Sequence, residues 1–101
     1  SVYMMLCTIV DYEGKPIRNS EKLKNRSQAL YEAIRQTLRQ GDTFTRYSNT
    51  QYLILLVGTS QEDCDVIYRR IVHKMKNIAG ARAEFKYSVV SLAELPQELI
   101  C

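Results

Sequence analysis

The segment RYSNTQYLILL, from Arg46 to Leu56, constrains the fold more than any other part of the sequence. Its two apolar-rich runs flank Ser48-Asn49-Thr50, a short polar turn, and this arrangement predicts a β-hairpin. The hairpin lies in the middle of the chain, between two helical patterns. We therefore expect a central sheet whose hairpin is preceded by one helix and followed by another.

Strand and helix patterns surround this hairpin. Residues 2–10, VYMMLCTIV, are apolar at almost every position, which is typical of a strand buried on both faces. Ser20 is expected to cap the first helix, and Gly41 follows where that helix is expected to stop. Ser60 and Asp63 approximate a capping box at the start of the second helix. The apolar positions are Leu23, Leu30, Ile34 and Leu38 in the first helix, and Cys64, Ile67, Ile71, Met75 and Ile78 in the second.

A last strand is predicted from Ala83 to Val89, where apolar and polar residues alternate after a loop at residues 77–82. The resulting order is β-α-β-β-α-β. This is the ferredoxin-like plan, an α+β sandwich in which one antiparallel sheet carries both helices on one face. RNA-binding sheets, small-molecule sensors and the palm of nucleotide cyclases share the plan, so the plan alone assigns no function.

Length and composition limit the remaining choices. A chain of 101 residues supports one domain with one core, and 46% apolar with 25% charged residues is an ordinary globular composition. No apolar run is long enough to cross a bilayer. The three cysteines predict neither a disulfide framework nor a zinc site, which favours a cytoplasmic location. Because the chain begins inside a strand-like run and stops at ELIC, we expect residues 1–101 to be one domain excised from a larger protein.

The segment LRQGDTFTRYSNTQYLILLVGTSQEDCDVIYRRI resembles the GGDEF family of bacterial diguanylate cyclases, which condense two GTP molecules into cyclic di-GMP. In that family an Arg-x-x-Asp pair ends the first long helix, an arginine lies on the next strand, and the Gly-Gly-Asp/Glu-Glu-Phe signature fills the hairpin turn. Here Arg39 and Asp42 match the pair, and Arg46 matches the strand arginine. The resemblance implies the palm-type sandwich of nucleotide cyclases. The signature positions hold Ser48, Asn49, Thr50, Gln51 and Tyr52.

Departures from the signature imply that the chemistry of the family is lost. The family's two glycines let GTP approach the backbone, whereas Ser48 and Asn49 carry side chains in that space. Thr50 replaces the acidic residue that binds the metal ions, Gln51 replaces the following glutamate, and Cys7 falls where the family has a second metal-binding aspartate. Magnesium ions beside a triphosphate need carboxylate oxygens. We therefore expect an inactive domain with no catalytic residue, no bound metal and no cofactor.

A second family site has matching residues. In active relatives the Arg-x-x-Asp pair forms an inhibitory site for cyclic di-GMP, which in some members is completed by an arginine on the next helix. The resemblance therefore implies a candidate cyclic di-GMP site at Arg39, Asp42 and Arg70. A structural interpretation competes with it, because an arginine in a last helical turn suits the helix dipole and an aspartate after Gly41 can bond to turn backbone. We favour the structural interpretation, since a turn aspartate needs no ligand to explain it.

The phrase RYSNTQYLILLVGTSQEDCDVIYRRI is also similar to the degenerate GGDEF-like tail of Firmicute regulators that carry a bacterial transcriptional activator domain. This resemblance implies a regulatory domain of a transcription or signal-transduction protein. Its partners would be other domains of the parent chain and a second copy of itself, and DNA would be contacted only through other domains. Three alternatives stay open: a nucleotide cyclase that uses Asp11, a nucleic-acid-binding sheet and a small-molecule sensor.

Overall fold

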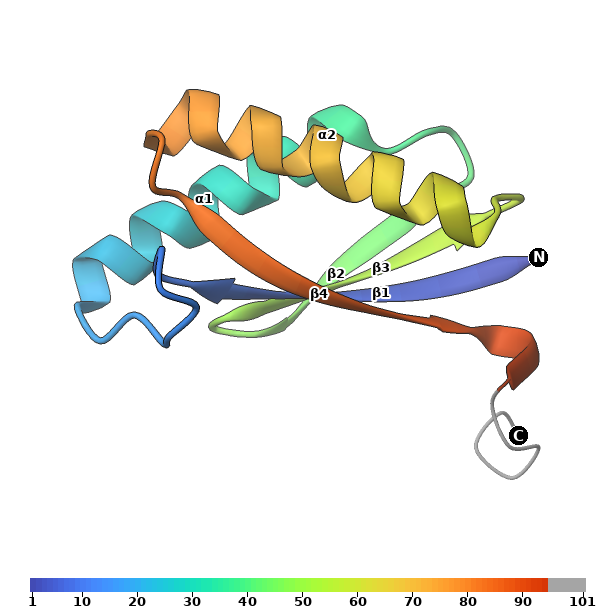
Figure 1. The fold of residues 1–101 in the computed structure, drawn as a ribbon, viewed down its shortest axis with the longest axis horizontal. Helices are drawn as coiled ribbons and strands as arrows, with labels where there is room; N and C mark the ends of the chain where they lie inside the picture. Colours follow the sequence, from blue (N-terminus) through green and yellow to red (C-terminus); the bar gives the residue numbers. More distant parts are fainter. Residues whose placement is uncertain (95–101) are drawn as a thin grey trace.

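The computed structural model describes residues 1–94 and confirms the predicted order of strands and helices (Figure 1). A short 3-10 turn, η1, follows the last strand. The elements are β1 (Val2–Val10), α1 (Ser20–Thr37), β2 (Thr43–Ser48), β3 (Gln51–Val57), α2 (Gln61–Ala79), β4 (Glu84–Ser91) and η1 (Leu92–Glu94).

The sheet has the strand order β2-β3-β1-β4, and all of its pairings are antiparallel. Strand β1 is central and pairs with both β3 and β4, while β2 and β4 form the edges. Both helices lie on the same face of the sheet (Figure 1). This arrangement is the ferredoxin-like α+β sandwich that the sequence predicts.

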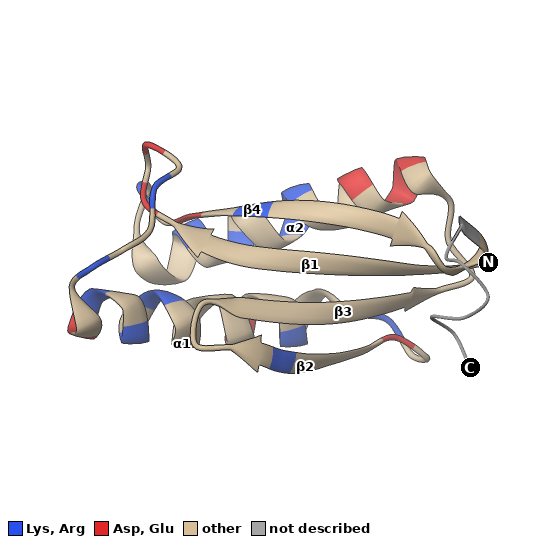
Figure 2. Cartoon of the chain, turned by 90° about the horizontal axis from the view of Figure 1, so that it is seen from below, with Lys and Arg blue, Asp and Glu red and all other residues tan. Residues whose placement is uncertain are grey.

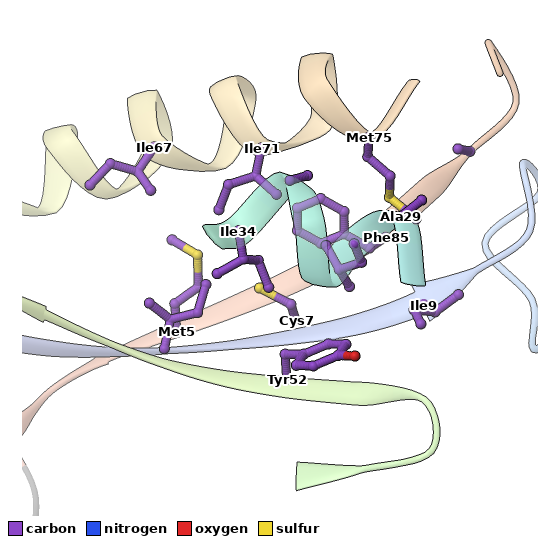
Figure 3. Packing of buried hydrophobic residues seen from close by; sticks show 14 of the residues in the cluster. Met5, Cys7, Ile9, Ala29, Ile34, Tyr52, Ile67, Ile71, Met75 and Phe85 are labelled. Carbon is purple, nitrogen blue, oxygen red and sulfur yellow. The ribbon is translucent and has the colours of Figure 1, made fainter. Parts of the chain in front are cut away.

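The core lies between the helices and the sheet, where side chains from both layers interdigitate (Figure 3). Burial of these apolar side chains supplies the main favourable term for folding. Helix α2 contributes the apolar stripe predicted for it, except that Ile78 in its last turn is 50% exposed. Side chains with almost no exposure include Met5, Cys7, Ile9, Leu30, Ile34, Ile54, Leu56, Ile71, Met75 and Phe85.

The prediction that β1 is buried on both faces is wrong for one of them. Met5, Cys7 and Ile9 are buried beneath the helices, but Met4 and Leu6 on the opposite face stay partly exposed. The reason is that α1 and α2 cover the same face of the sheet, and neither of them covers the other face (Figure 1). The strands hold few charged residues, whereas acidic and basic residues gather on the helices and loops (Figure 2).

The boundaries of the first helix differ from the prediction. Asn19, rather than Ser20, is its N-cap, because Asn19 has extended backbone angles and its side chain accepts a hydrogen bond from the Lys22 amide at 2.8 Å. The helix ends at Thr37. Gly41 does not terminate it directly but lies in the following turn, at a φ of +96° that favours glycine.

The second helix begins as predicted and continues further than predicted. The Ser60 side chain accepts a hydrogen bond from the Asp63 amide at 3.2 Å, so the predicted cap is confirmed. The helix extends through Ala79 to Gly80, which shortens the loop expected at residues 77–82. No helix among residues 1–94 is both long and apolar enough to cross a membrane.

Candidate functional site

The tip of the β2–β3 hairpin holds the residues at the signature positions. Ser48 ends β2, Gln51 begins β3, and Asn49 and Thr50 form the turn between them. No residue other than glycine has a positive φ among residues 1–94, so this turn forms without the glycines of the family signature. The strand register shifts between Arg46 and Ser48, and such an irregularity adjusts local strand twist.

The polar side chains at the tip bond to each other. The Ser48 hydroxyl donates to Gln51 Oε1 at 3.0 Å and accepts from the Thr50 amide at 3.3 Å. Gln51 Nε2 donates to the Thr8 hydroxyl at 3.2 Å, and the Ile9 amide donates to the Thr50 carbonyl at 2.8 Å. The side chains of the turn therefore form an uncharged hydrogen-bond network that ties the hairpin to β1, and Arg46 Nε also donates to the Ser48 carbonyl at 3.2 Å.

Acidic groups are sparse around this tip. Cys7 lies in the core, and burial raises the pKa of its thiol to about 12, so it stays neutral. Asp11 accepts hydrogen bonds from the Lys15 and Glu13 amides, and the bond from Lys15 contributes most to lowering its pKa. Among residues 1–94 no group of three or more His, Cys, Asp or Glu side chains could hold a metal ion.

Tyr52, at the last signature position, faces the helices. Its side chain is buried, and its hydroxyl lies 3.1 Å from the Ser27 hydroxyl and 3.4 Å from the Ser27 carbonyl. Its ring packs beside those of Tyr31 and Phe44. Tyr52 therefore fixes α1 against β3, a contact between residues 25 positions apart in the chain.

The opposite end of the hairpin holds Arg39 and Asp42. Arg39 donates from Nε to Asp42 Oδ2 at 2.9 Å and from Nη2 to Oδ1 at 3.2 Å, which makes a bidentate pair. Asp42 also accepts from the Arg39 amide at 3.1 Å and from the Val57 amide at 3.0 Å. Arg39 Nη2 completes the link by donating to the Val57 carbonyl at 3.2 Å.

Burial and electrostatics give these two side chains different roles. The Asp42 side chain is 1% exposed, while that of Arg39 is 44% exposed. Burial by itself raises the pKa of Asp42, but the hydrogen bonds from Arg39 and Val57 together outweigh it, so the pKa lies below the ordinary 3.8. Asp42 thus bonds to turn backbone as the structural interpretation expects, and it also closes the base of the hairpin.

Arg70 lies apart from this pair. It is exposed on α2 and, with Val66, Arg69, His73 and Lys74, lines a shallow hollow of about 450 Å³. Within the described part of the chain, no hydrogen bond or ion pair joins it to Arg39 or Asp42. The structure therefore brings together two of the three candidate ligand-binding residues and places the third on a neighbouring helix.

The sequence reasoning missed two features. One is the reach of Asp42 to the Val57 amide, which only the paired strands bring close. The other is an open hollow of about 530 Å³ beside β2. Strand residues line most of it, and Tyr31 is the one aromatic lining residue that a helix contributes. Its signal in the sequence is weak, because Tyr31 directly follows the core residue Leu30 and lies off the main apolar stripe of α1.

Two solved structures share this fold. An EAL/GGDEF domain protein from M. capsulatus matches with a TM-score of 0.62 and 22% identity, covering 92% of this chain and 65% of that chain. A truncated Pseudomonas aeruginosa protein that comprises only a GGDEF domain matches with a TM-score of 0.57 and 15% identity, covering 87% of this chain and 55% of that one. No protein-family model and no curated protein matches the sequence.

These matches place the chain in a fold class. Residues 1–94 form a palm-type α+β sandwich like that of GGDEF domains, which confirms the predicted fold. The chain spans less than two thirds of the length of either solved structure. Identities of 22% and 15% establish the likeness of fold alone, so the activity of this chain rests on its own residues.

Proposed function

We propose that this chain is a catalytically inactive GGDEF-like regulatory domain that acts through contacts with other protein domains. One observation carries the proposal: the tip of the hairpin is a neutral network in which Ser48, Thr50 and Gln51 bond to one another and to β1. Two magnesium ions and a triphosphate need several anionic oxygens close together. The tip offers hydroxyl and amide groups in their place.

The setting of the domain is part of the same proposal. We infer a bacterial transcription or signal-transduction protein of the cytoplasm, in which this domain works beside other domains of a longer chain. The similarity of RYSNTQYLILLVGTSQEDCDVIYRRI to the tail of Firmicute activator-domain regulators supports this setting. DNA would be bound by those other domains, and the present domain would dock or form dimers.

Cyclic di-GMP is the ligand proposed for the region of Arg39, Asp42 and Arg70. The Asp42 carboxylate is engaged by Arg39 and Val57, so its role is to hold the guanidinium of Arg39 in place. Arg39 is partly exposed, and its Nη1 group, which bonds to neither Asp42 nor Val57, can donate to a phosphate. Arg70 is exposed, and its guanidinium can offer a fork of donors to a phosphate or to the O6/N7 edge of guanine.

The loss of catalysis is tested by turnover. The domain is incubated with GTP and magnesium, and the products are separated by chromatography beside an active GGDEF domain as a positive control. We expect no cyclic di-GMP from this chain at concentrations where the control converts its substrate completely. Product formation above the background of a heat-denatured sample would contradict the proposal.

Ligand binding is tested by calorimetry with cyclic di-GMP. We expect heat that saturates at micromolar to high micromolar ligand, and about tenfold weaker binding by Arg70→Ala. Arg39→Lys keeps a cation beside Asp42 but loses the bidentate pair and the Nη1 group, so its thermal unfolding is measured beside its affinity to separate ligand contact from folding. The absence of heat in the unsubstituted domain, or unchanged affinity in both variants, would contradict the proposed binding of cyclic di-GMP. The proposal of a domain that docks on other protein domains would then stand alone.

A further inference from the structure

Strand β2 has an open edge. It pairs with β3 on one side, and on its other side no strand follows within residues 1–94. Its pairing with β3 is regular from Thr43 to Arg46, and the register shift lies between Arg46 and Ser48. An edge strand turns unpaired N–H and C=O groups outward, and these can pair with an added extended segment.

A hollow of about 530 Å³ lies beside this edge, on the face of the sheet that carries the helices. Alternate residues of a strand point to one face, so Phe44 and Arg46 of β2 both face the helices, opposite Ile54 and Tyr52 of β3. Helix α1 supplies the far wall. The residues that line the hollow are Gln28, Tyr31, Phe44, Thr45, Arg46 and Tyr52.

Aromatic rings line this hollow. The Tyr31 ring lies 5.4 Å from that of Phe44 and 6.4 Å from that of Tyr52, and the Phe44 and Tyr52 rings are 6.1 Å apart. Tyr52 is held by its hydroxyl contacts with Ser27, whereas Tyr31 is 39% exposed and Phe44 is partly exposed. A fixed and partly exposed aromatic surface suits a large apolar side chain, because little freedom is lost on binding.

Arg46 is the one charged residue in the lining. Its Nε donates to the Ser48 carbonyl at 3.2 Å, which orients the guanidinium. Within residues 1–94 it has no ion pair, so its terminal amino groups are available to an anion. A carboxylate matches the bidentate geometry of these groups.

We propose that the open edge of β2 and the adjoining hollow bind an extended, acidic segment of a partner protein by strand addition. Phe44 and Arg46 are two residues apart on one face, so the segment carries its large apolar and acidic residues two positions apart. In an antiparallel addition, as in the rest of the sheet, the acidic residue precedes the apolar one. This surface rests on the proposed function, which is contact with other protein domains, and names where such a partner docks. It does not depend on the binding of cyclic di-GMP near Arg39.

The test uses synthetic peptides of seven residues, acetylated and amidated, with threonine at the unspecified positions and a fluorescent label. The first peptide has glutamate two positions before phenylalanine, which places both side chains on one face. We expect it to bind with sub-millimolar affinity, measured by fluorescence anisotropy. A control peptide with glutamate and phenylalanine adjacent presents them on opposite faces and should bind about tenfold more weakly.

Variants of the domain locate the site. Arg46→Gln removes the charge and should weaken binding of the first peptide about fivefold to tenfold, while Tyr31→Ala should weaken it by a similar factor. Arg70→Gln is the matched control, because it removes an exposed arginine on the other helix and should leave peptide affinity unchanged. Thermal unfolding of each variant shows whether the fold is intact.

Failure of this proposal is distinguishable from failure of the proposed function. Arg46→Gln should leave cyclic di-GMP binding and the absence of GTP turnover as they are, whereas the Arg39 and Arg70 variants should leave peptide binding as it is. The proposal is overturned if the two peptides bind equally, if neither binds at millimolar protein, or if Arg46→Gln has no effect. It is also overturned if guanosine monophosphate displaces the peptide, which would mark the hollow as a nucleotide site.

Discussion

The two ends of the β2–β3 hairpin differ in how they use polar residues. At the base, the buried Asp42 carboxylate accepts hydrogen bonds from Arg39 and from the Val57 amide. At the tip, Ser48 and Gln51 bond through neutral groups that remain partly exposed. The comparison teaches that the Arg39–Asp42 pair is accounted for by its structural contacts, without a ligand. We expect substitutions at the base to lower the free energy of unfolding more than substitutions at the tip do.

The largest expected effect is that of Asp42→Ala. The variant leaves the Val57 amide and the Arg39 guanidinium without their acceptor, so we expect a loss of about 2 to 3 kcal/mol in the free energy of unfolding. Urea unfolding followed by circular dichroism measures it. The control is Glu13→Ala in an exposed loop, which should change stability by less than about 0.5 kcal/mol. A loss as small as that of the control would show that the base is not a stabilising clamp.

Lowering the pH should weaken the base without any mutation. The folded pKa of Asp42 lies below the ordinary 3.8, so its contribution is present above that value and is lost as the pH falls through the folded pKa. We expect the free energy of unfolding to decrease from about pH 5 downward. In Asp42→Asn this decrease should be smaller, and identical pH profiles for the two proteins would contradict the assignment.

Removal of the Tyr52 hydroxyl should have an intermediate effect. Tyr52→Phe keeps the ring in its place beside Phe44 and Tyr31 but leaves the buried Ser27 without its partner. We expect a loss of about 1 kcal/mol, measured by urea unfolding. Tyr47→Phe is the control, because Tyr47 is 65% exposed and should show no change. Equal effects in the two variants would mean that the hydroxyl contact contributes nothing.

The smallest effect is expected at the tip. Ser48→Ala removes the hydroxyl that bonds to Thr50 and Gln51, but water can reach these partly exposed groups. We expect a loss of about 0.5 kcal/mol or less in unfolding free energy. A loss as large as that of Asp42→Ala would reverse the comparison and give the tip an essential structural role.

The fold could be predicted from the sequence to a large extent because its signals are local. The alternation after Ala83 and the cap at Ser60 each depend on residues within a few positions of one another, and the structure confirms both. The predicted cap of the first helix is wrong by one residue, since Asn19 and Ser20 are both good caps and only the backbone angles and the hydrogen bond from the Lys22 amide identify Asn19. The prediction that residues 2–10 are buried on both faces is wrong, because an apolar pattern does not state whether helices cover one face of a sheet or both.

The candidate site was predictable only in part. The sequence places Arg39 and Asp42 close enough to pair, and the structure shows the pair. The sequence does not show that Asp42 is buried or where Arg70 lies, because both depend on how the helices and the hairpin pack. The hollow beside β2 combines Tyr31 from a helix with Arg46 from a strand, and no sequence spacing connects them.

The sequence by itself determined the order of the strands and helices, the neutral character of the hairpin tip and the absence of the signature acids at residues 48–52. These follow from residue identity and short-range periodicity. The tertiary structure decided that Asp42 closes the hairpin through Val57, that Tyr52 bonds to Ser27 and that α1 and α2 cover the same face of the sheet. The physical reason is that hydrogen bonds between distant residues form only after packing has brought their strands and helices together.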